Sequence, residues 1–364
     1  MGLHRIDNRP IPRSSGECRA FMVCNNEAER LPYLFDYHRH LGVHRFIVVD
    51  NNSNDGSYDF LASQPDCHLF HTAESFAAAN HGVKWLNFLL EEYGPDHWCL
   101  VLDADELFVY PHSEEISLPE FCAYLDRSES QGVVAYLLDM YSRCPISQAK
   151  YTPGTPFLDT CPYFDRDYLI RSRFGFSVGN WPWPDIEVVG GPRLRCFYSG
   201  FQGASRIRTN LPKAVRLAKR SGIGRSLRID RLQLGSDVPP LLTKVPLVKG
   251  VNGHQYINNH KPKPVPLAPE TGALLHFKYF ADFYPRVEQA VTAGEHYDGA
   301  SEYALYQSVL RSQPEMGFFY EGSQRYRGTP QLIDLGLIRT TPAFEQWRQS
   351  RSRESEETRT RVVA

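Results

Sequence analysis

The sequence predicts an α/β fold, a mostly parallel sheet flanked by helices, and two observations carry this prediction. Over residues 17–145, short apolar runs alternate with amphipathic segments of helical spacing. Each of the clearest apolar runs also ends in polar side chains, as strands of a parallel sheet do where ligands bind. The stretch 98–108 shows this best, because a run suited to a buried strand leads directly into Asp103, Asp105 and Glu106.

The first strand, helix and strand follow one another closely in the chain. Residues 20–24 are apolar and predict a strand, and residues 30–41 carry apolar side chains at helical spacing. Pro32 is tolerated in the first turn of that helix, and Gly42 is a suitable stop. Residues 45–49 are again apolar. A strand, a helix and a strand in this order form a βαβ unit, so the two strands should be parallel.

The remaining elements are predicted in the same way. Up to residue 140 we expect helices at 58–63, 83–93 and 118–125, the last begun by a Ser117–Glu120 capping box, and strands at 68–70, 98–102 and 132–138. From 142 onward the chain reads as loop-rich, with short strands at 188–189, 195–198 and 273–277 and helical residues at 282–311, broken at Gly294. We therefore expect an N-terminal tail (1–16), one domain (17–340, with halves 17–145 and 146–340) and a disordered tail (341–364).

Composition narrows the class of protein. A formal net charge of −2 provides no general attraction to nucleic acid or to a membrane. No run approaches the roughly 18 apolar residues of a membrane span, and the polar start lacks a signal sequence, so we expect a cytoplasmic protein. The eight cysteines form no CxxC pair, which disfavours a zinc ribbon or a thioredoxin-type site.

Asp103 and Asp105 are the first candidate site. In an extended chain, residues two apart point the same way, so both carboxylates could share one hard cation. The alternative is the first turn of a helix, where acids are also favoured. Glu106 has two interpretations as well. It is either a supporting group of the site or simply an acid in the first turn of the following segment.

Residues 50–57 are the second candidate. An EF-hand loop is excluded, because neither register places a glutamate at its twelfth position. A plain polar turn remains one interpretation, and a loop that binds a nucleobase and ribose is the other. The sequence contains neither a P-loop nor a G-x-G-x-x-G turn, so a bound diphosphate would need a carboxylate-held divalent cation.

Three segments in order, 24–27, 48–57 and 102–106, resemble a family 2-type glycosyltransferase of GT-A fold, in the bacterial branch that also resembles family 92. The resemblance covers about residues 18–145 and recurs near 274–283. It implies a GT-A-like nucleotide-diphospho-sugar transferase fold with a loop-rich acceptor half. Donor-binding residues would be Asn26, Glu27, Asp50, Asn51 and Asn52, with Asp50 and an adjacent asparagine on the base and ribose.

The same resemblance implies that Asp103 and Asp105 bind the ribose and a Mn²⁺ or Mg²⁺ ion that bridges the diphosphate. His276, after a short apolar strand, matches the late histidine that many such enzymes use as a further metal ligand. A histidine satisfied in the core is the alternative. Lys278, two residues on, could reach a phosphate.

An inverting transferase needs a general base for the acceptor hydroxyl. Asp139, at the end of the strand after the DxD strand, is one candidate, although the family's Glu-Asp pair is absent there. Asp185 and Glu187 are the others.

Other features of the second half have two interpretations each. Trp181 and Trp183 could form a sugar platform or anchor a loop, and Arg193 and Arg195 could reach phosphate or form surface ion pairs. A basic run could contact anionic lipid or a lipid-linked acceptor at the inner face of the membrane, or be a solvated face. It comprises Lys213, Arg216, Lys219, Arg220, Arg225, Arg228 and Arg231.

The expected function is metal-dependent transfer of a hexose from a nucleotide sugar, a UDP-sugar first, to a hydroxyl of a glycan or glycoconjugate acceptor, with inversion, in polysaccharide biosynthesis. No nucleic-acid partner is expected. The alternatives are a non-catalytic nucleotide- or carbohydrate-binding protein of the same fold and a two-carboxylate glycoside hydrolase.

Overall fold

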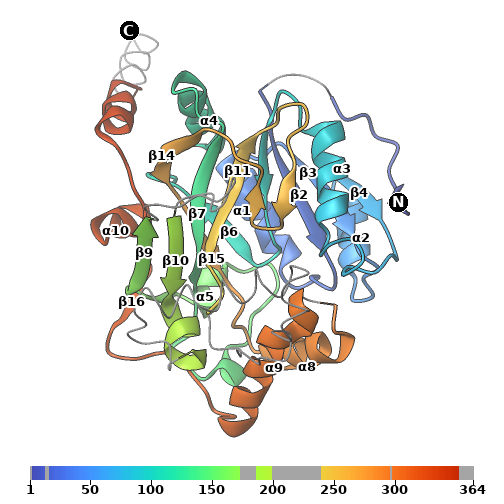
Figure 1. Cartoon of the computed structure of the whole chain (residues 1–364), viewed down its shortest axis with the longest axis vertical. Coiled ribbons are helices and arrows are strands. Elements are labelled where there is room, and N and C mark those ends of the chain that lie inside the picture. The colour runs from blue at the N-terminus through green and yellow to red at the C-terminus, as the bar shows by residue number, and fades with distance from the viewer. Residues whose placement is uncertain (1, 13–15, 173–185, 199–238, 296, 352–364) are drawn as a thin grey trace, which may run out of the picture.

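The computed structural model describes residues 2–12, 16–172, 186–198, 239–295 and 297–351, and a sheet with helices on both faces dominates it (Figure 1). The sheet has the order β1-β4-β3-β2-β5-β11-β7-β15-β6, with β14 alongside β7. Its strands are β1 (His4–Arg5), β2 (Cys18–Cys24), β3 (Arg45–Asp50), β4 (Cys67–His71), β5 (Trp98–Val101), β6 (Glu106–Val109), β7 (Gly132–Asp139), β11 (Thr243–Lys249), β14 (Leu267–Thr271) and β15 (Ala273–His276).

Most of these strands run in one direction. β2 pairs in parallel with β3 and β5, β3 with β4, and β15 with β7. β11 lies antiparallel between β5 and β7, so β7 has the same direction as β5. β6 is antiparallel to β15, and β1 to β4. The predicted α/β class with a mostly parallel sheet flanked by helices is therefore confirmed.

Smaller elements complete the described chain. Three two-stranded sheets pair β8 (Tyr163–Asp165) with β16 (Ser323–Arg325), β9 (Tyr168–Ser172) with β10 (Ile186–Gly190), and β12 (Tyr256–Asn258) with β13 (Lys261–Pro262). The helices are α1 (Leu31–Leu41), α2 (Ser57–Ser63), α3 (Val83–Tyr93), α4 (Leu118–Arg127), α5 (Phe157–Thr160), α8 (Phe283–Ala293), α9 (Tyr297–Ser312) and α10 (Thr329–Asp334). Short 3₁₀ and π-helical turns lie at Ile146–Gln148 and Arg193–Phe197.

Alternation along the strands builds one apolar layer on each face of the sheet. On β3, Phe46 and Val48 join the layer that contains the buried residues of α1 and α4, whereas Ile47 and Val49 join the layer that contains those of α3. Because both faces are covered, the strands carry apolar residues at successive positions rather than at every second one. The buried strands therefore hold their carboxyl ends in fixed positions.

The elements predicted for the first half are present within one or two residues, and the capping box of Ser117 and Glu120 begins α4. The helix break at Gly294 is also confirmed, since α8 ends there with a positive φ of 64°. One expected strand is absent, since residues 195–197 lie in a π-helical turn. Glu106 begins strand β6, and β1 lies within residues 1–16.

The largest difference is β11, a central strand that the sequence did not reveal. Pro246 lacks the N–H that a ladder needs, and Lys244 is a charge inside an apolar run. The register between β11 and β7 shifts between Lys244 and Leu247, so an irregularity accommodates the proline. Beyond the short strands and helices expected for the loop-rich second half, that half therefore inserts a strand into the middle of the sheet.

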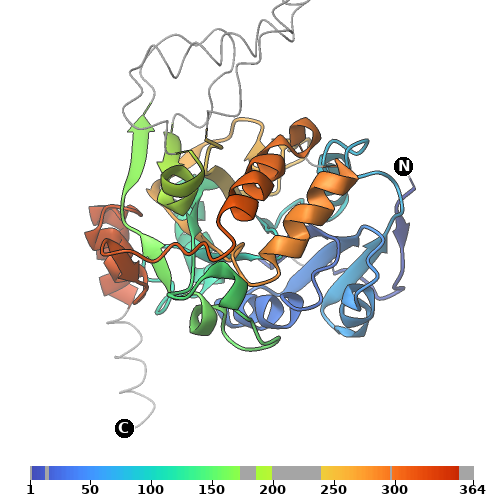
Figure 2. The same ribbon diagram turned by 90° about the horizontal axis from the view of Figure 1, so that it is seen from below.

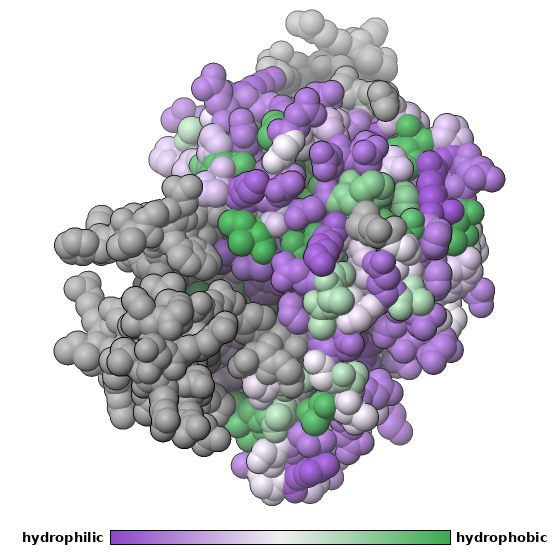
Figure 3. All heavy atoms as spheres, turned by 45° about the vertical axis from the view of Figure 1, so that its right-hand side comes forward, coloured by the Kyte–Doolittle hydropathy of each residue, from purple (hydrophilic) through white to green (hydrophobic). Residues whose placement is uncertain are grey.

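The C-terminal region is also more ordered than predicted from residue 341. Residues 342–351 are helical, Phe344 is fully buried, and Trp347 packs against Tyr124 of α4. Residues 352–364 lie outside the described ranges. The face in Figure 3 is largely hydrophilic with scattered apolar side chains. Among the described helices, none has both the length and the apolar composition that a bilayer crossing requires.

A buried ion pair joins the two halves of the chain beside the sheet. Arg30, directly before α1, is 1% exposed and donates to both carboxylate oxygens of Asp282, directly before α8, at 2.7 and 2.9 Å. Arg286 of α8 donates to Asp282 and to Glu27. Figure 1 shows α8 and α9 at the lower edge of the sheet, where these contacts hold α8.

The substitution Arg30→Met should therefore lower the free energy of unfolding by about 3 kcal/mol, because it leaves a partly buried carboxylate with fewer partners. Arg39→Met is a matched control on the same helix, since Arg39 forms a two-pronged pair with Asp66 near the surface. That control should cost about 1 kcal/mol or less. Urea unfolding of both variants measures the difference, and equal losses would show that the buried pair has no special role.

Candidate functional site

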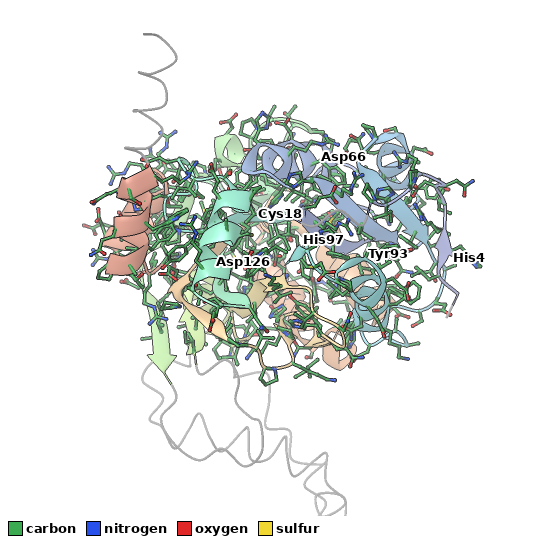
Figure 4. All side chains as sticks on the ribbon, turned by 90° about the horizontal axis from the view of Figure 1, so that it is seen from above. His4, Cys18, Asp66, Tyr93, His97 and Asp126 are labelled. Carbon is green, nitrogen blue, oxygen red and sulfur yellow. The ribbon has the colours of Figure 1, made fainter. Side chains whose placement is uncertain are left out.

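Polar side chains gather where the parallel strands of the sheet end. Asp50, His71, Asp139 and His276 are the last residues of β3, β4, β7 and β15, and Asp103 follows β5 by two positions. Because these strands share a direction, their carboxyl ends meet at one edge, which Figure 2 views from the side of α8 and α9. Figure 4 views the opposite edge, where Cys18 and His97 mark the beginnings of β2 and β5.

The loops after β2 and β3 are tied together by side chains of the predicted donor motifs. Asn26 accepts from the Asn54 N–H at 2.8 Å and donates its own N–H to Ser53 at 2.9 Å. The Asn51 amide donates to two carbonyl oxygens beyond β4, whereas Asn52 is exposed. These contacts account for much of the polar composition of residues 50–57, which therefore form a braced loop.

Asp50 differs from its neighbours because it is fully buried and only half satisfied. Its Oδ2 atom accepts from the Ser53 N–H at 3.2 Å and lies 3.0 Å from Nδ1 of His71. Its Oδ1 atom is buried and has no hydrogen-bond donor among the described residues. A buried carboxylate oxygen without a partner is costly, so this atom is suited to accept a hydrogen bond from a ligand.

Asp103 and Asp105 lie on a tight turn between β5 and β6, and Glu106 is the first residue of β6. The Glu106 N–H donates to the Asp103 carbonyl at 3.2 Å, and the Glu106 carboxylate accepts from the Asp103 N–H at 2.9 Å. Glu106 is 1% exposed, whereas the Asp103 side chain is 47% exposed. Of the two expectations for Glu106, the supporting group of the site is the one that the geometry favours.

A lysine from the second half neutralises this turn. Lys244 of β11 is fully buried and donates to Asp103 at 3.0 Å and to both Glu106 oxygens at 2.7 and 3.0 Å. Burial opposes the charge on Lys244, but the two carboxylates outweigh it and hold the pKa of the amine above its usual range. Lys244 therefore remains a cation inside the protein.

Asp105 belongs to a second charged cluster with His276 and Asp139. Nε2 of His276 lies 3.3 Å from an Asp105 oxygen, and Nδ1 lies 2.6 Å from an Asp139 oxygen. Asp139 and His276 are direct neighbours on the parallel strands β7 and β15. Because a carboxylate can only accept, Nδ1–H donates to Asp139, and Asp139 thereby fixes the orientation of the ring.

Charge balance in this cluster favours the ionised forms. Burial alone would lower the pKa of His276, but the Asp105 and Asp139 charges outweigh it and raise the pKa to about 9. Burial would raise the pKa of Asp139, but Arg193 and His276 hold it well below its usual range. Arg193 donates to both Asp139 oxygens, at 2.9 and 2.7 Å.

The remaining predicted residues have partners of their own. The Glu27 carboxylate pairs with Arg286, and Lys278 lies over the Tyr303 and Tyr306 rings at 4.6 and 4.7 Å and 3.9 Å from Glu302. Arg193 forms a buried pair rather than a surface pair.

Some predicted residues lie outside the described ranges: Trp181, Trp183, Asp185 and the basic run at 213–231. Of Glu187, only the backbone on β10 is described.

The metal site remains a prediction. Within the described residues, no three His, Cys, Asp or Glu side chains converge as ligands for one ion. Asp105 and His276 are close enough to act together, but Asp103 is held by Lys244 instead. A carboxylate with a histidine oriented by a second carboxylate is nevertheless a donor set that fits a divalent cation whose remaining ligands come from substrate or water.

The sequence did not indicate that Lys244, Arg30 and Arg286 pair with the acidic residues of the site. Lys244 carries the same sequence signal as Asp103, a charge within an apolar run, but the proline two residues later concealed the strand. Arg30 and Arg286 carry no local signal, because their roles depend on how α1 and α8 approach each other.

Comparison with known proteins supports one part of the resemblance. No family model matches the sequence. A glycosyltransferase family 92 protein of Arabidopsis thaliana is 28% identical over 120 residues, a match that covers 29% of this chain and 19% of that protein. The part of this chain that matches therefore spans about a fifth of the length of that relative. The chain is thus similar to a glycosyltransferase, which supports the transferase class at a coarse level, while the family 2 resemblance stays a prediction.

Similar solved structures include a protein described as a glucose-1-phosphate thymidylyltransferase from Bacillus anthracis, with TM-score 0.24 and 8% identity over 38% of this chain and 65% of that one. A 4-diphosphocytidyl-2C-methyl-D-erythritol synthase has TM-score 0.23 and 14% identity, covering 35% and 63%. These likenesses are too distant to bear on activity.

The cluster around His276 makes a prediction about pH. Since its pKa of about 9 lies above the 6.5 of an unperturbed histidine, its contribution to the free energy of unfolding is complete below about pH 6.5 and is lost as the pH rises through 9. Asp139→Asn removes one of the two charges that raise this pKa. In the chelator-treated variant, the His276 ring observed by NMR should titrate closer to 6.5.

Asp165→Asn is the matched control for this measurement. Asp165 is also buried at a strand end and also pairs with an arginine, Arg195, but it does not contact His276. Its variant should leave the titration of His276 unchanged. An unaltered pKa in Asp139→Asn would contradict the assigned contact.

Proposed function

We propose that this chain is a metal-dependent glycosyltransferase that moves a sugar from a nucleoside diphosphate sugar to a hydroxyl of a glycan or glycoconjugate acceptor. The observation that carries the proposal is that the cluster of Asp105, His276 and Asp139 and the half-satisfied Asp50 lie at the same edge of the sheet. A buried acceptor can bind an N–H of a nucleobase, and a cation site can neutralise a diphosphate. The family 92 match over 120 residues supports the same class of reaction.

Asp50 would recognise the nucleobase. Its free Oδ1 atom is buried and can only accept a hydrogen bond. Uracil, thymine and guanine can donate to such an acceptor through a ring N–H, and cytosine and adenine can donate through an exocyclic amino group. The braced loop with Asn51 and Asn52 would lie against the ribose. A UDP-sugar is the first donor to test.

Asp105 and His276 would hold a Mn²⁺ or Mg²⁺ ion, with Asp103 reaching the ion or the ribose through the oxygen that Lys244 leaves available. When bound, such an ion supplies positive charge to the leaving diphosphate. The protein residues orient the donor. Asp139 fixes the His276 ring, and Lys244 and Glu106 fix the turn of Asp103.

Asp139 was also predicted as the general base, and the geometry supports a different role for it. It is fully buried, and its oxygens accept from Arg193 and His276, so an acceptor hydroxyl has no access to it. We propose Asp139 as a positioning residue. Proton abstraction by Asp185 stays a prediction, as do Lys278 at a phosphate, inversion and a lipid-linked acceptor.

A donor screen tests the reaction class. The protein should release a nucleoside diphosphate from a UDP-, dTDP- or GDP-sugar in the presence of Mn²⁺, and chelation should suppress that release. A coupled assay for the free nucleoside diphosphate measures both. If no donor turns over with any glycan acceptor while UDP still binds, the chain is a non-catalytic nucleotide-binding protein, a candidate that the Lys244 pairing of Asp103 also favours.

The two aspartates provide a second test. Asp103→Asn and Asp105→Asn should each reduce turnover by about 100-fold or more, because each removes a charge on which donor binding depends. Asp66→Asn, at a surface ion pair with Arg39, is the control and should keep wild-type activity. Thermal unfolding verifies that the variants are folded. Near-full activity of either site variant would show that the proposed site is wrong.

A further inference from the structure

Lys244 is a fully buried cation of the site, and its hydrogen bonds within the described residues go to the carboxylates of Asp103 and Glu106. Its side chain is fully buried on β11, opposite Ala135 of β7. The ammonium group has three N–H donors, and three carboxylate oxygens lie within 3.0 Å: one from Asp103 and two from Glu106. Lys244 therefore has no donor left for a substrate and cannot contact one.

The effect of this arrangement falls on Asp103. The Asp103 N–H is bound by the Glu106 carboxylate, its carbonyl by the Glu106 N–H, and its carboxylate Oδ2 by Lys244. A side chain that is 47% exposed would otherwise rotate freely in water. Here backbone and carboxylate are both fixed, and one carboxylate oxygen remains for a ligand.

Glu106 and Lys244 also depend on each other. Glu106 is 1% exposed and Lys244 is fully buried, so loss of Lys244 would leave Glu106 as a buried charge without its cation, and loss of Glu106 would leave Lys244 with Asp103 alone. The pair could therefore serve stability alone. The third contact, to the half-exposed Asp103, is the one that a purely structural pair would not need.

We propose that Lys244 is a positioning residue for nucleoside diphosphate binding: through Oδ2 it holds Asp103 so that the other oxygen faces the ribose or the cation. This inference rests on the proposed function. It assigns the two aspartates different supports, Lys244 for Asp103 and His276 for Asp105. It also makes β11, a strand from the second half, part of the donor site.

The single variant Lys244→Met leaves Glu106 charged and buried, so it could fail to fold. The informative variant is the double substitution Lys244→Gln with Glu106→Gln, which replaces the ion pair with two amides of similar size. Glu106→Gln retains an oxygen for the Asp103 N–H, so the turn stays capped. The charged contacts of residue 244 to Glu106 and to Asp103 are both lost, but no unpaired charge is left buried at residues 106 and 244.

Isothermal titration of UDP in the presence of Mn²⁺ provides the readout. The double variant should keep a thermal unfolding midpoint near that of wild type and bind UDP about 10-fold or more weakly, as loss of a supporting partner does at other metal sites. Glu106→Gln alone removes the Lys244–Glu106 ion pair but keeps the Lys244–Asp103 contact, so it should weaken UDP binding less than the double variant does. The control outside the site is Lys249→Met, a more exposed lysine of the same strand paired with Asp126, which should bind UDP as wild type does.

A third substitution tests whether Lys244 acts through Asp103. Adding Asp103→Asn to the double variant should weaken UDP binding no further, because coupled residues are not additive. Equal UDP affinity in the double variant and the wild type would overturn the role of Lys244, as would a full additional loss from Asp103→Asn. If wild type itself binds no UDP, with or without Mn²⁺, the proposed function fails and the role of Lys244 fails with it.

Discussion

The structure depends on the pairing of carboxylates from the first half of the chain with cations from the second. Glu27 pairs with Arg286, Asp103 and Glu106 with Lys244, and Asp105 and Asp139 with His276 and Arg193. Acids at the ends of buried strands would be too costly to desolvate alone. The second half supplies their partners from β11, β15, α8 and the turn at 193–197, and this pairing draws the two halves into one sheet and one site.

The same pairing explains why the sequence predicted the acidic side of the site and not the basic side. The acids follow regular apolar strands, so their position at a strand end could be inferred from residues 98–108 alone. Lys244 lies in a strand that the sequence does not predict, because Pro246 is unusual inside a strand. Arg286 lies on an ordinary amphipathic helix. Both residues act only through contacts between segments that are distant in the sequence. Such contacts leave no local pattern from which they could be predicted.

The fold was predictable for a related reason. The alternation of apolar runs and amphipathic helices up to β7 is a local signal, and the elements appeared close to their expected bounds. The insertion of antiparallel β11 between β5 and β7 depends instead on contacts between residues that lie far apart in the sequence. The helix at 342–351 was missed because its polar composition hides Phe344 and Trp347, whose burial against α4 depends on tertiary packing.

A site whose acids are already paired has a consequence for ligand binding. A cation at Asp105 must compete with the charge on His276, and a diphosphate would meet a sheet edge where the positive groups are already oriented by their carboxylate partners. The most direct test is a crystal structure of the protein with UDP and Mn²⁺, using the anomalous signal of manganese. The account predicts a peak bonded to Asp105 and Nε2 of His276, with the UDP base against Asp50. UDP bound at another edge of the sheet, or manganese that contacts neither residue, would contradict it.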